Sequence, residues 1–165
     1  MEERGNFVNM LRAEELSAPE RRVRGVKPMS AEKLVGNWTL VSWQVVSDGA
    51  VTEPFGVRPK GHLILTREGR SIAITTAAVR AAGESQAARA ALHRSMLAYT
   101  GKYRVEGDEF ITKVDVSWNE GWNGTEQQRR FRLEGDTLFI ESAPAPSITS
   151  PGKTDFRRMV WRRER

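Results

Sequence analysis

Histidine is the side chain best suited to transfer protons at neutral pH, and this chain has only two. His62 follows Gly61 in an apolar run with the composition of a strand, and an imidazole there could act as a general acid or base. The pattern does not indicate which face of the strand His62 occupies, and a lone strand histidine is more often structural or exposed. His93 lies between Leu92 and Arg94, where we expect it on the solvent-exposed side of a helix.

Gln127 and Arg129 are candidates for contacts with a polar ligand group, because strand alternation places both on an inward face. A buried charge costs several kcal/mol unless it is paired or hydrated, so an inward Arg129 predicts an acidic ligand group, a partner carboxylate or water. Glu126 points the other way and is not that partner. In the alternative interpretation, Arg129 lies near the mouth of the fold and reaches solvent.

Aromatic side chains could hold an apolar ligand. Trp118 and Trp122 flank a short loop, where they could clamp a flat molecule while an indole N–H fixes its orientation, or could instead close the core. Ser42 and Gln44 add polar groups on the face of Trp38, if that tryptophan points inward. The predicted ligand contacts are Ser42, Gln44, His62, Tyr99, Tyr103, Val114, Trp118, Trp122, Gln127 and Arg129.

The remaining composition excludes several classes of site. The absence of cysteine excludes disulfides, iron–sulfur clusters and thiol nucleophiles, and two separated histidines cannot form a three-histidine metal site. No glycine-rich phosphate loop and no Gly-x-Ser-x-Gly motif occurs. We therefore expect no metal and no cofactor.

The chain is moderately basic, since 26 lysines and arginines against 21 acidic residues give a net charge of +5. Several of the basic residues lie in the last strand, where one exposed face accounts for them, so nucleic-acid binding remains a minor alternative. No apolar run approaches the roughly 20 residues needed to cross a bilayer, and residues 1–30 lack the apolar stretch of a secretory signal. These observations predict a cytoplasmic protein with no membrane partner.

Short runs rich in Val, Trp and Thr predict strands, of which 61–66 and 71–76 are joined in a hairpin by Glu68-Gly69. A near-repeat follows, in which 103–111 and 131–139 each contain a strand, a Glu-Gly-Asp turn and a second strand. Alternation places one set of side chains inside. That set is Tyr103, Val105, Phe110, Thr112, Val114, Val116, Trp118, Gln127, Arg129, Phe131 and Leu133.

Residues 84–99 predict the one helix, because the stretch is rich in alanine, lacks glycine and proline, and has an apolar stripe at helical spacing. Ser85 is the expected N-cap, and Gly101 lies just beyond the expected end. We expect the stripe to pack on the sheet as a lid or plug. The stripe consists of Ala88, Leu92, Met96 and Tyr99.

Eight main strands, with one helix between the third and the fourth, predict a mainly β fold. Hairpin connections throughout favour a single up-and-down eight-stranded antiparallel barrel, because closure leaves no exposed edge. The interior of such a barrel can be filled or can hold one small ligand. We assign residues 34–165 to this domain and residues 1–33 to a disordered tail, with Met29 as an alternative start of the protein.

The opening of the first strand, Gly36-Asn37-Trp38, resembles the Gly-x-Trp signature of lipocalins. The resemblance implies that the tryptophan plugs the closed end of the barrel under an arginine of the last strand, Arg163 or Arg157. The chain from Leu34 to Arg163 is similar to a microbial family of lipocalin-like domain proteins. The matching segments are, in order, 34–43, 54–56, 61–64, 97–103, 122–127 and 160–161. The position of the helix and the lack of cysteine depart from secreted lipocalins, so the resemblance implies a fold and a pocket but not the biology of a secreted carrier.

These observations lead us to expect that the protein binds a small, largely hydrophobic molecule in a barrel cavity. The alternative is a cofactor-independent enzyme of the isomerase or cyclase type that acts on a small hydrophobic metabolite. No catalytic residue is assigned, and the candidates are His62, Arg129 and Tyr99. Whether the protein is an enzyme, and whether it forms a homodimer, stay open.

Overall fold

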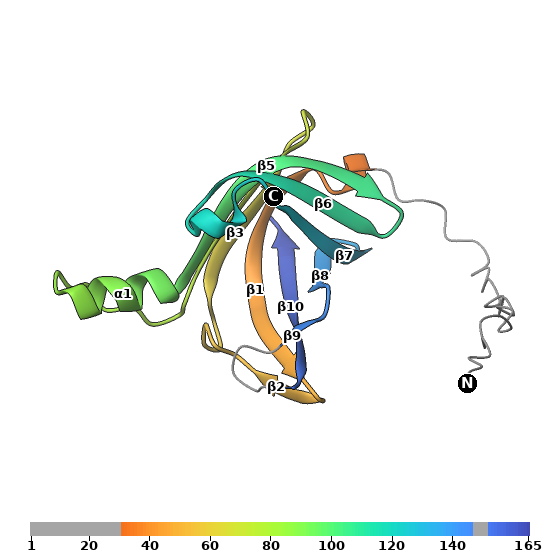
Figure 1. Ribbon diagram of the computed structural model, residues 1–165. Coiled ribbons are helices and arrows are strands. Elements are labelled where there is room, and N and C mark those ends of the chain that lie inside the picture. Colours follow the sequence, from red (N-terminus) through yellow and green to blue (C-terminus); the bar gives the residue numbers. More distant parts are fainter. Residues whose placement is uncertain (1–30, 147–151) are drawn as a thin grey trace, which may run out of the picture.

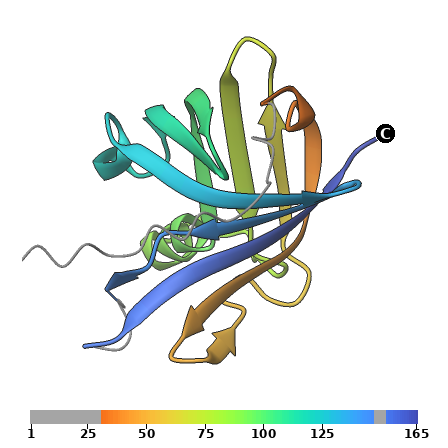
Figure 2. The same cartoon turned by 90° about the vertical axis from the view of Figure 1, so that its right-hand side faces the viewer.

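Alternating apolar and polar residues form eight long antiparallel strands in the computed structural model, which describes residues 31–146 and 152–165. The strands are β1 (Gly36–Ser47), β3 (Lys60–Leu65), β4 (Arg70–Thr76), β5 (Met96–Glu106), β6 (Glu109–Ser117), β7 (Glu126–Glu134), β8 (Thr137–Ser142) and β10 (Thr154–Arg163). Each pairs with the next long strand, and β10 also pairs with β1, which closes the sheet (Figure 1, Figure 2). The predicted mainly β, up-and-down barrel is confirmed.

Shorter elements complete the described part of the chain. They are η1 (Ala31–Lys33), β2 (Ala50–Thr52), α1 (Gln86–Arg94), η2 (Glu120–Trp122) and β9 (Ala145–Pro146). The helix α1 joins β4 to β5, which are the third and fourth long strands, as predicted. Of the segment predicted to be a tail, residues 1–30 lie outside the described residues and the last three residues form η1.

The two ends of the barrel differ in their connections. The β3–β4, β5–β6 and β7–β8 turns lie at one end, which we call the hairpin end, and the longer connections, with α1 and η2, lie at the other, the loop end. In the two Glu-Gly-Asp turns, Gly107 has a φ of 63° and Gly135 a φ of 57°. A glycine with positive φ at the first central position is what a type II′ hairpin turn requires. The near-repeat therefore forms two hairpins with the same turn chemistry.

One apolar core lies between the strands of the barrel. Every long strand contributes at least one buried apolar side chain to it. The buried members are Leu34, Trp38, Leu40, Leu63, Leu65, Ala73, Tyr99, Phe110, Val114, Phe131, Leu138, Ile140 and Trp161. Removal of this apolar surface from water is the main driving force for folding.

Trp38 closes the hairpin end. Its side chain is fully buried, and its indole Nε1 donates to the Leu34 carbonyl at 3.0 Å. The Arg163 guanidinium lies 4.1 Å from the centre of the Trp38 ring and donates to the carbonyls of Val35 and Lys33, at 2.7 and 2.6 Å. Each polar group of this closure therefore has a partner.

Gly36 makes room for that closure. Its φ is 145°, a conformation that L side chains rarely adopt, and a Cβ at this position would lie 2.7 Å from the Arg163 Nη1. The Gly-x-Trp pattern thus lets the arginine reach Trp38. Of the two arginines considered from the sequence, Arg163 covers the tryptophan and Arg157 does not.

The helix is shorter than the sequence pattern predicts. α1 begins after Ser85, whose hydroxyl accepts a hydrogen bond from the Ala88 N–H at 3.1 Å, so the predicted N-cap is confirmed. The helix ends at Arg94, and residues 96–99 belong to β5, where they pair with β4. A helix through Tyr99 is therefore wrong, because the β4 ladder satisfies the backbone groups of these residues and buries Tyr99 in the barrel.

α1 does not cover the barrel. No residue of α1 is buried, and in Figure 1 the helix extends away from the strands. Arg80 holds its C-terminal end by donating to the Leu92 carbonyl and to the Ser95 hydroxyl, both at 3.0 Å. The expected lid or plug is wrong, because the helix retains only Ala88 and Leu92 of the apolar stripe.

Candidate functional site

Strand register decides which predicted ligand contacts face the interior. Directly paired residues share one face of a sheet. Trp38 of β1 pairs with Leu63 of β3, Leu63 pairs with Ala73 of β4, and Ala73 pairs with Tyr99 of β5. These residues therefore all face inward, as Trp38 does. The ladders of β5 with β6 and of β6 with β7 extend the same face. The predicted contacts that face inward on these strands are Tyr99, Tyr103, Val114, Gln127 and Arg129.

A β-bulge in β1 reverses the face of two predicted contacts. Leu40 and Ser42 pair with successive residues of β10, so Val41 is an extra residue. Beyond the bulge the alternation shifts by one position, and Ser42 and Gln44 lie on the outer face. Gln44 Nε2 donates there to a carboxylate oxygen of Glu53 at 3.2 Å. The prediction that both share the face of the first tryptophan is therefore wrong.

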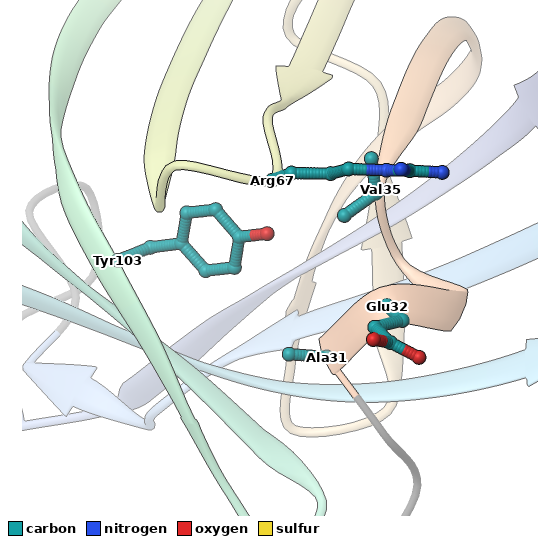
Figure 3. Close-up of a pocket in the computed structure, with 5 residues that line it drawn as sticks. All are labelled: Ala31, Glu32, Val35, Arg67 and Tyr103. Carbon is teal, nitrogen blue, oxygen red and sulfur yellow. The ribbon is translucent and has the colours of Figure 1, made fainter.

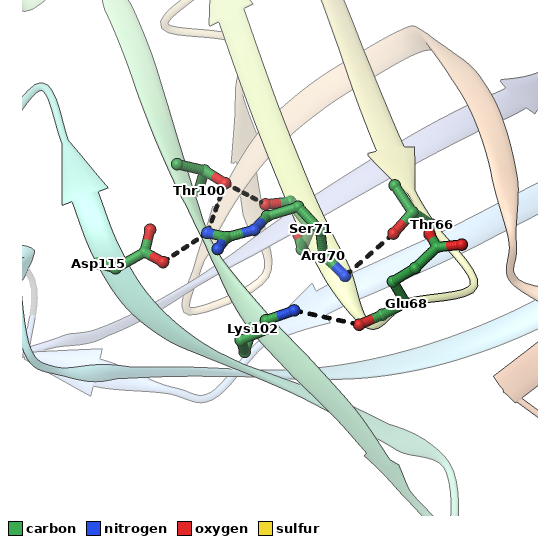
Figure 4. Close-up of polar contacts among 7 residues, drawn as sticks. All are labelled: Thr66, Glu68, Arg70, Ser71, Thr100, Lys102 and Asp115. Carbon is green, nitrogen blue, oxygen red and sulfur yellow. Dashed lines mark hydrogen bonds and ion pairs between the residues drawn. The ribbon is translucent and has the colours of Figure 1, made fainter.

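A second bulge lies in β6, where Asp115 is the extra residue. It turns Val116 outward, with 62% of its surface exposed, although strict alternation predicts it inside. On the outer face, the Arg70 guanidinium forms an ion pair with Asp115 and donates to the Thr100 hydroxyl at 3.4 Å (Figure 4). Gly101 lies beside the bulge, where a Cβ would collide with a β6 carbonyl, so it allows close strand approach and does not end a helix.

His62 lies on the outer face of β3. Its Nδ1 is 3.0 Å from the Glu164 Oε1, and 58% of its side chain is exposed. The Thr39 hydroxyl donates to the same oxygen at 2.5 Å, and these contacts, that of Thr39 first, hold the pKa of Glu164 below its usual value. Because His62 points away from the interior, the structure contradicts its prediction as a contact or proton carrier for a ligand inside the barrel.

An aromatic cluster, formed by Tyr99, Trp118 and Trp122, lies at the loop end. The Trp122 ring is 5.6 Å from Tyr99 and 5.0 Å from Trp118, in edge-on arrangements. Trp122 is held by η2, which begins after Asn119, whose side chain accepts from the Gly121 N–H at 3.1 Å. The Trp118 Nε1 is buried and has no hydrogen-bond partner within the described residues. The structure thus brings three predicted contacts together. The predicted inward position of Trp118 on its strand is wrong, because Trp118 follows the bulge of β6 and its backbone N–H donates to the carbonyl of Ala98, which faces outward.

Arg129 and Gln127 lie side by side on the inward face of β7. Arg129 Nη2 donates to Gln127 Oε1 at 2.9 Å, and its Nη1 donates to the Gln128 carbonyl at 2.8 Å. Both side chains are half-buried. Thr112, which pairs with Gln127, is fully buried, and its hydroxyl has no partner in the described part of the chain. Of these three side chains, only Thr112 has a buried polar atom without a partner among the described residues.

Two side chains face inward that were not predicted from the sequence. Trp43 follows the bulge of β1 and stacks on Phe55 with 4.6 Å between ring centres. Arg157 lies two residues before Met159, which packs against the core, so Arg157 also faces inward. Nothing in the sequence marks the bulge that turns Trp43 inward, whereas alternation counted back from Trp161 would have found Arg157.

A hollow of about 390 Å³ lies at the hairpin end (Figure 3). It is lined by Ala31, Glu32, Val35, Arg67 and Tyr103. The Tyr103 hydroxyl donates to the Thr66 carbonyl at 3.0 Å, and burial, followed by the nearby Glu68, raises the pKa of this tyrosine. Tyr103 is thus a neutral donor with its own partner, at the opposite end of the barrel from the aromatic cluster.

Within residues 31–146 and 152–165, no group of three or more His, Cys, Asp or Glu side chains is placed to hold a metal ion. No helix in these residues has the length and apolarity to cross a membrane.

One protein family matches almost the whole barrel. Residues 35–164 match the family described as lipocalin-like domain. The crystal structure of an uncharacterised protein from Bacteroides eggerthii aligns with a TM-score of 0.41 and 16% identity, over 79% of this chain and 98% of that one. No curated protein matches the sequence. Because the family match runs from the start of β1 to the end of β10, the chain belongs to the lipocalin-like domain family.

Proposed function

We propose that this barrel binds a small, largely hydrophobic molecule at its loop end. The observation that carries the proposal is that the Trp118 indole N–H, beside the rings of Trp122 and Tyr99, is buried without a hydrogen-bond partner among the described residues. A buried polar group left unpaired costs about 1–3 kcal/mol. A ligand that accepts a hydrogen bond from the indole would remove that cost.

The surrounding side chains suit an apolar ligand. Trp122 and Tyr99 present aromatic surface beside Trp118, and the stacked pair of Trp43 and Phe55 adds more. Burial of apolar surface contributes about 25 cal/mol per Å², and the few polar groups would fix the orientation of the ligand. Membership of the lipocalin-like domain family supports the same ligand class.

The enzymatic alternative has less support. It needs a proton carrier inside the barrel, and His62 lies outside. It therefore depends on Arg129 and Tyr99, for which no contact points to catalysis rather than to binding.

Fluorescence titration with Nile red, a neutral dye that brightens in apolar surroundings, tests the proposal. We expect saturable binding of one dye per chain, and Trp122→Ala should weaken it about tenfold, which corresponds to about 1.4 kcal/mol. Val116→Ala is the matched control, because it removes an apolar side chain from the outer face. Binding that does not saturate, or equal weakening by both substitutions, would contradict the proposal.

A further inference from the structure

Two arginines flank Ser142 on the inward face near the loop end. Arg129 of β7 pairs directly with Ser142 of β8, and the backbone N–H of Arg157 in β10 donates to the Ser142 hydroxyl at 2.9 Å. Neighbouring strands lie about 4.8 Å apart, so the Cα atoms of the two arginines are roughly 10 Å apart. Side chains as long as these can converge on one group between them.

Neither of these arginines has a carboxylate partner in the described part of the chain. The guanidinium of Arg129 donates to neutral oxygens of Gln127 and Gln128. The guanidinium of Arg157 has no hydrogen bond or ion pair with a described residue, and the bond to Ser142 uses its backbone N–H. Both side chains are half-buried.

The next residue along each strand behaves differently. Arg130 faces outward on β7 and forms an ion pair with Asp108 at 3.3 Å, and Arg158 faces outward on β10 and forms one with Glu141 at 2.9 Å. The outward arginine of each neighbouring pair therefore has a carboxylate partner, whereas the inward arginine has none among the described residues. This contrast between adjacent residues indicates that a group outside these strands binds the guanidinium groups of the inward arginines.

The inward face around the two arginines has an excess of positive charge. Beside them on the ladders lie Phe110, which pairs with Arg129, and Val45, which pairs with Arg157. On the inward faces of the described strands, Asp155 is the one carboxylate near them, with 4% of its surface exposed, and it already has an interaction of its own. Two guanidinium groups and one engaged carboxylate leave a positive charge that favours an anion.

We infer that Arg129 and Arg157 bind the carboxylate of an amphipathic organic acid, whose apolar part packs against the aromatic cluster. The planar guanidinium donates two parallel hydrogen bonds to a carboxylate, which gives orientation as well as binding energy. This inference rests on the proposed function and names its ligand class, a hydrophobic molecule with one carboxylate group.

Displacement of Nile red by decanoate and by decanol, at neutral pH, tests the inference with two ligands that differ in the head group. The wild-type protein should bind decanoate at least about tenfold more tightly than decanol, or about 1.4 kcal/mol. Arg129→Gln and Arg157→Gln should each remove most of that preference and leave the affinity for decanol nearly unchanged. Arg130→Gln and Arg158→Gln are the matched controls and should keep the preference.

The outcomes separate the inference from the proposed function. If decanoate and decanol bind equally well to the wild-type protein, the carboxylate inference is overturned while binding of a hydrophobic molecule stands. If all four arginine variants lose the preference equally, general positive charge causes it, and the inference is also overturned. If Nile red, decanoate and decanol all fail to bind, the proposed function itself is wrong. The comparison of acid and alcohol in the wild-type protein decides the question even if a variant does not fold.

Discussion

The hairpin end and the loop end are built from the same eight strands, but Trp38 and Arg163 at the hairpin end are paired differently from Trp118 and Arg157 at the loop end. Ser71 and Trp161, toward the hairpin end, also have a buried side-chain polar atom without a partner among the described residues, so the contrast concerns these two tryptophans and two arginines. At the hairpin end, the Trp38 indole donates to a carbonyl, and the Arg163 guanidinium both covers that indole and donates to two carbonyls. At the loop end, the Trp118 indole has no partner within the described residues, and the inward Arg157 guanidinium has none there either. Each end thus contains a tryptophan and an arginine. Their polar groups are hydrogen-bonded at the hairpin end, whereas the Trp118 indole and the Arg157 guanidinium have no partner among the described residues at the loop end.

This difference separates a structural role from a binding role. Buried polar groups in proteins are nearly always hydrogen-bonded, and exceptions call for a specific explanation. The contact between Trp38 and Arg163 stabilises the barrel, and because its polar groups are all paired it offers none to a ligand. The unpaired Trp118 indole at the loop end lowers the stability of the barrel unless a ligand bonds to it.

The largest stability loss should follow Trp38→Ala. The side chain is fully buried and its N–H is paired, so we expect a loss of about 3–5 kcal/mol in the free energy of unfolding. Trp118→Ala should lose less than half as much, because Trp118 is half-buried and its N–H has no partner among the described residues. Equilibrium unfolding in urea measures both variants. Equal losses would show that the two ends do not differ in this way.

Arg163→Met should have the next largest effect. The substitution keeps much of the apolar contact with Trp38 but removes the hydrogen bonds to the carbonyls of Val35 and Lys33, so we expect a loss of about 1.5–3 kcal/mol. Arg162→Met, on the exposed face of the same strand, should change stability by no more than about 0.5 kcal/mol. Thermal unfolding monitored by circular dichroism compares the two. A similar change in both variants would contradict the role assigned to Arg163.

Thr112→Val should leave stability unchanged or raise it by up to about 1 kcal/mol. The substitution replaces a fully buried hydroxyl that has no partner in the described residues by a methyl group of similar size. Urea unfolding of the ligand-free protein measures the effect. A loss of more than about 1 kcal/mol would mean that the hydroxyl is already paired in the absence of a ligand.

The smallest effect should come from Glu164, which ties the end of β10 to β1 and β3. The Thr39 hydroxyl and then His62 hold the pKa of Glu164 below its usual value. Because the pKa is lowered in the folded protein, its contribution to stability is present at neutral pH and is lost as the pH falls through the lowered pKa. The small stability difference between wild type and Glu164→Gln should therefore shrink on acidification from about pH 6 to pH 3. A difference that grows over this range would contradict the direction of the shift.

The two hairpins of the second half could be predicted because strand alternation, turn residues and the positions of aromatic residues agree there. Alternation, turn glycines with positive φ at Gly107 and Gly135, and inward aromatic residues all indicate the same two hairpins. Gly36 and Trp38 likewise identify the closed end, since the pattern needs a residue without Cβ under the arginine. In these segments the local pattern was sufficient to place the side chains.

The errors arose where one residue changes the register. The extra residues Val41 and Asp115 reverse the face of every side chain beyond them, and neither stands out in composition. As a result, Ser42, Gln44, Val116 and Trp118 were placed on the wrong face. The helix ended early for a different reason, because residues 96–99 gain more from pairing with β4 than from helical propensity.

The five tryptophan indole N–H signals in a nitrogen–proton correlation spectrum provide the most direct test of a binding site at the loop end. The protein would be saturated with decanoate or decanol, whichever binds more tightly, after assignment of the signals by Trp→Phe substitution. We predict that the signals of Trp118 and Trp122 move and that the signal of Trp38, whose N–H already donates to Leu34, stays in place. A shift confined to Trp38, or saturation without any shift of Trp118 and Trp122, would contradict the proposed site.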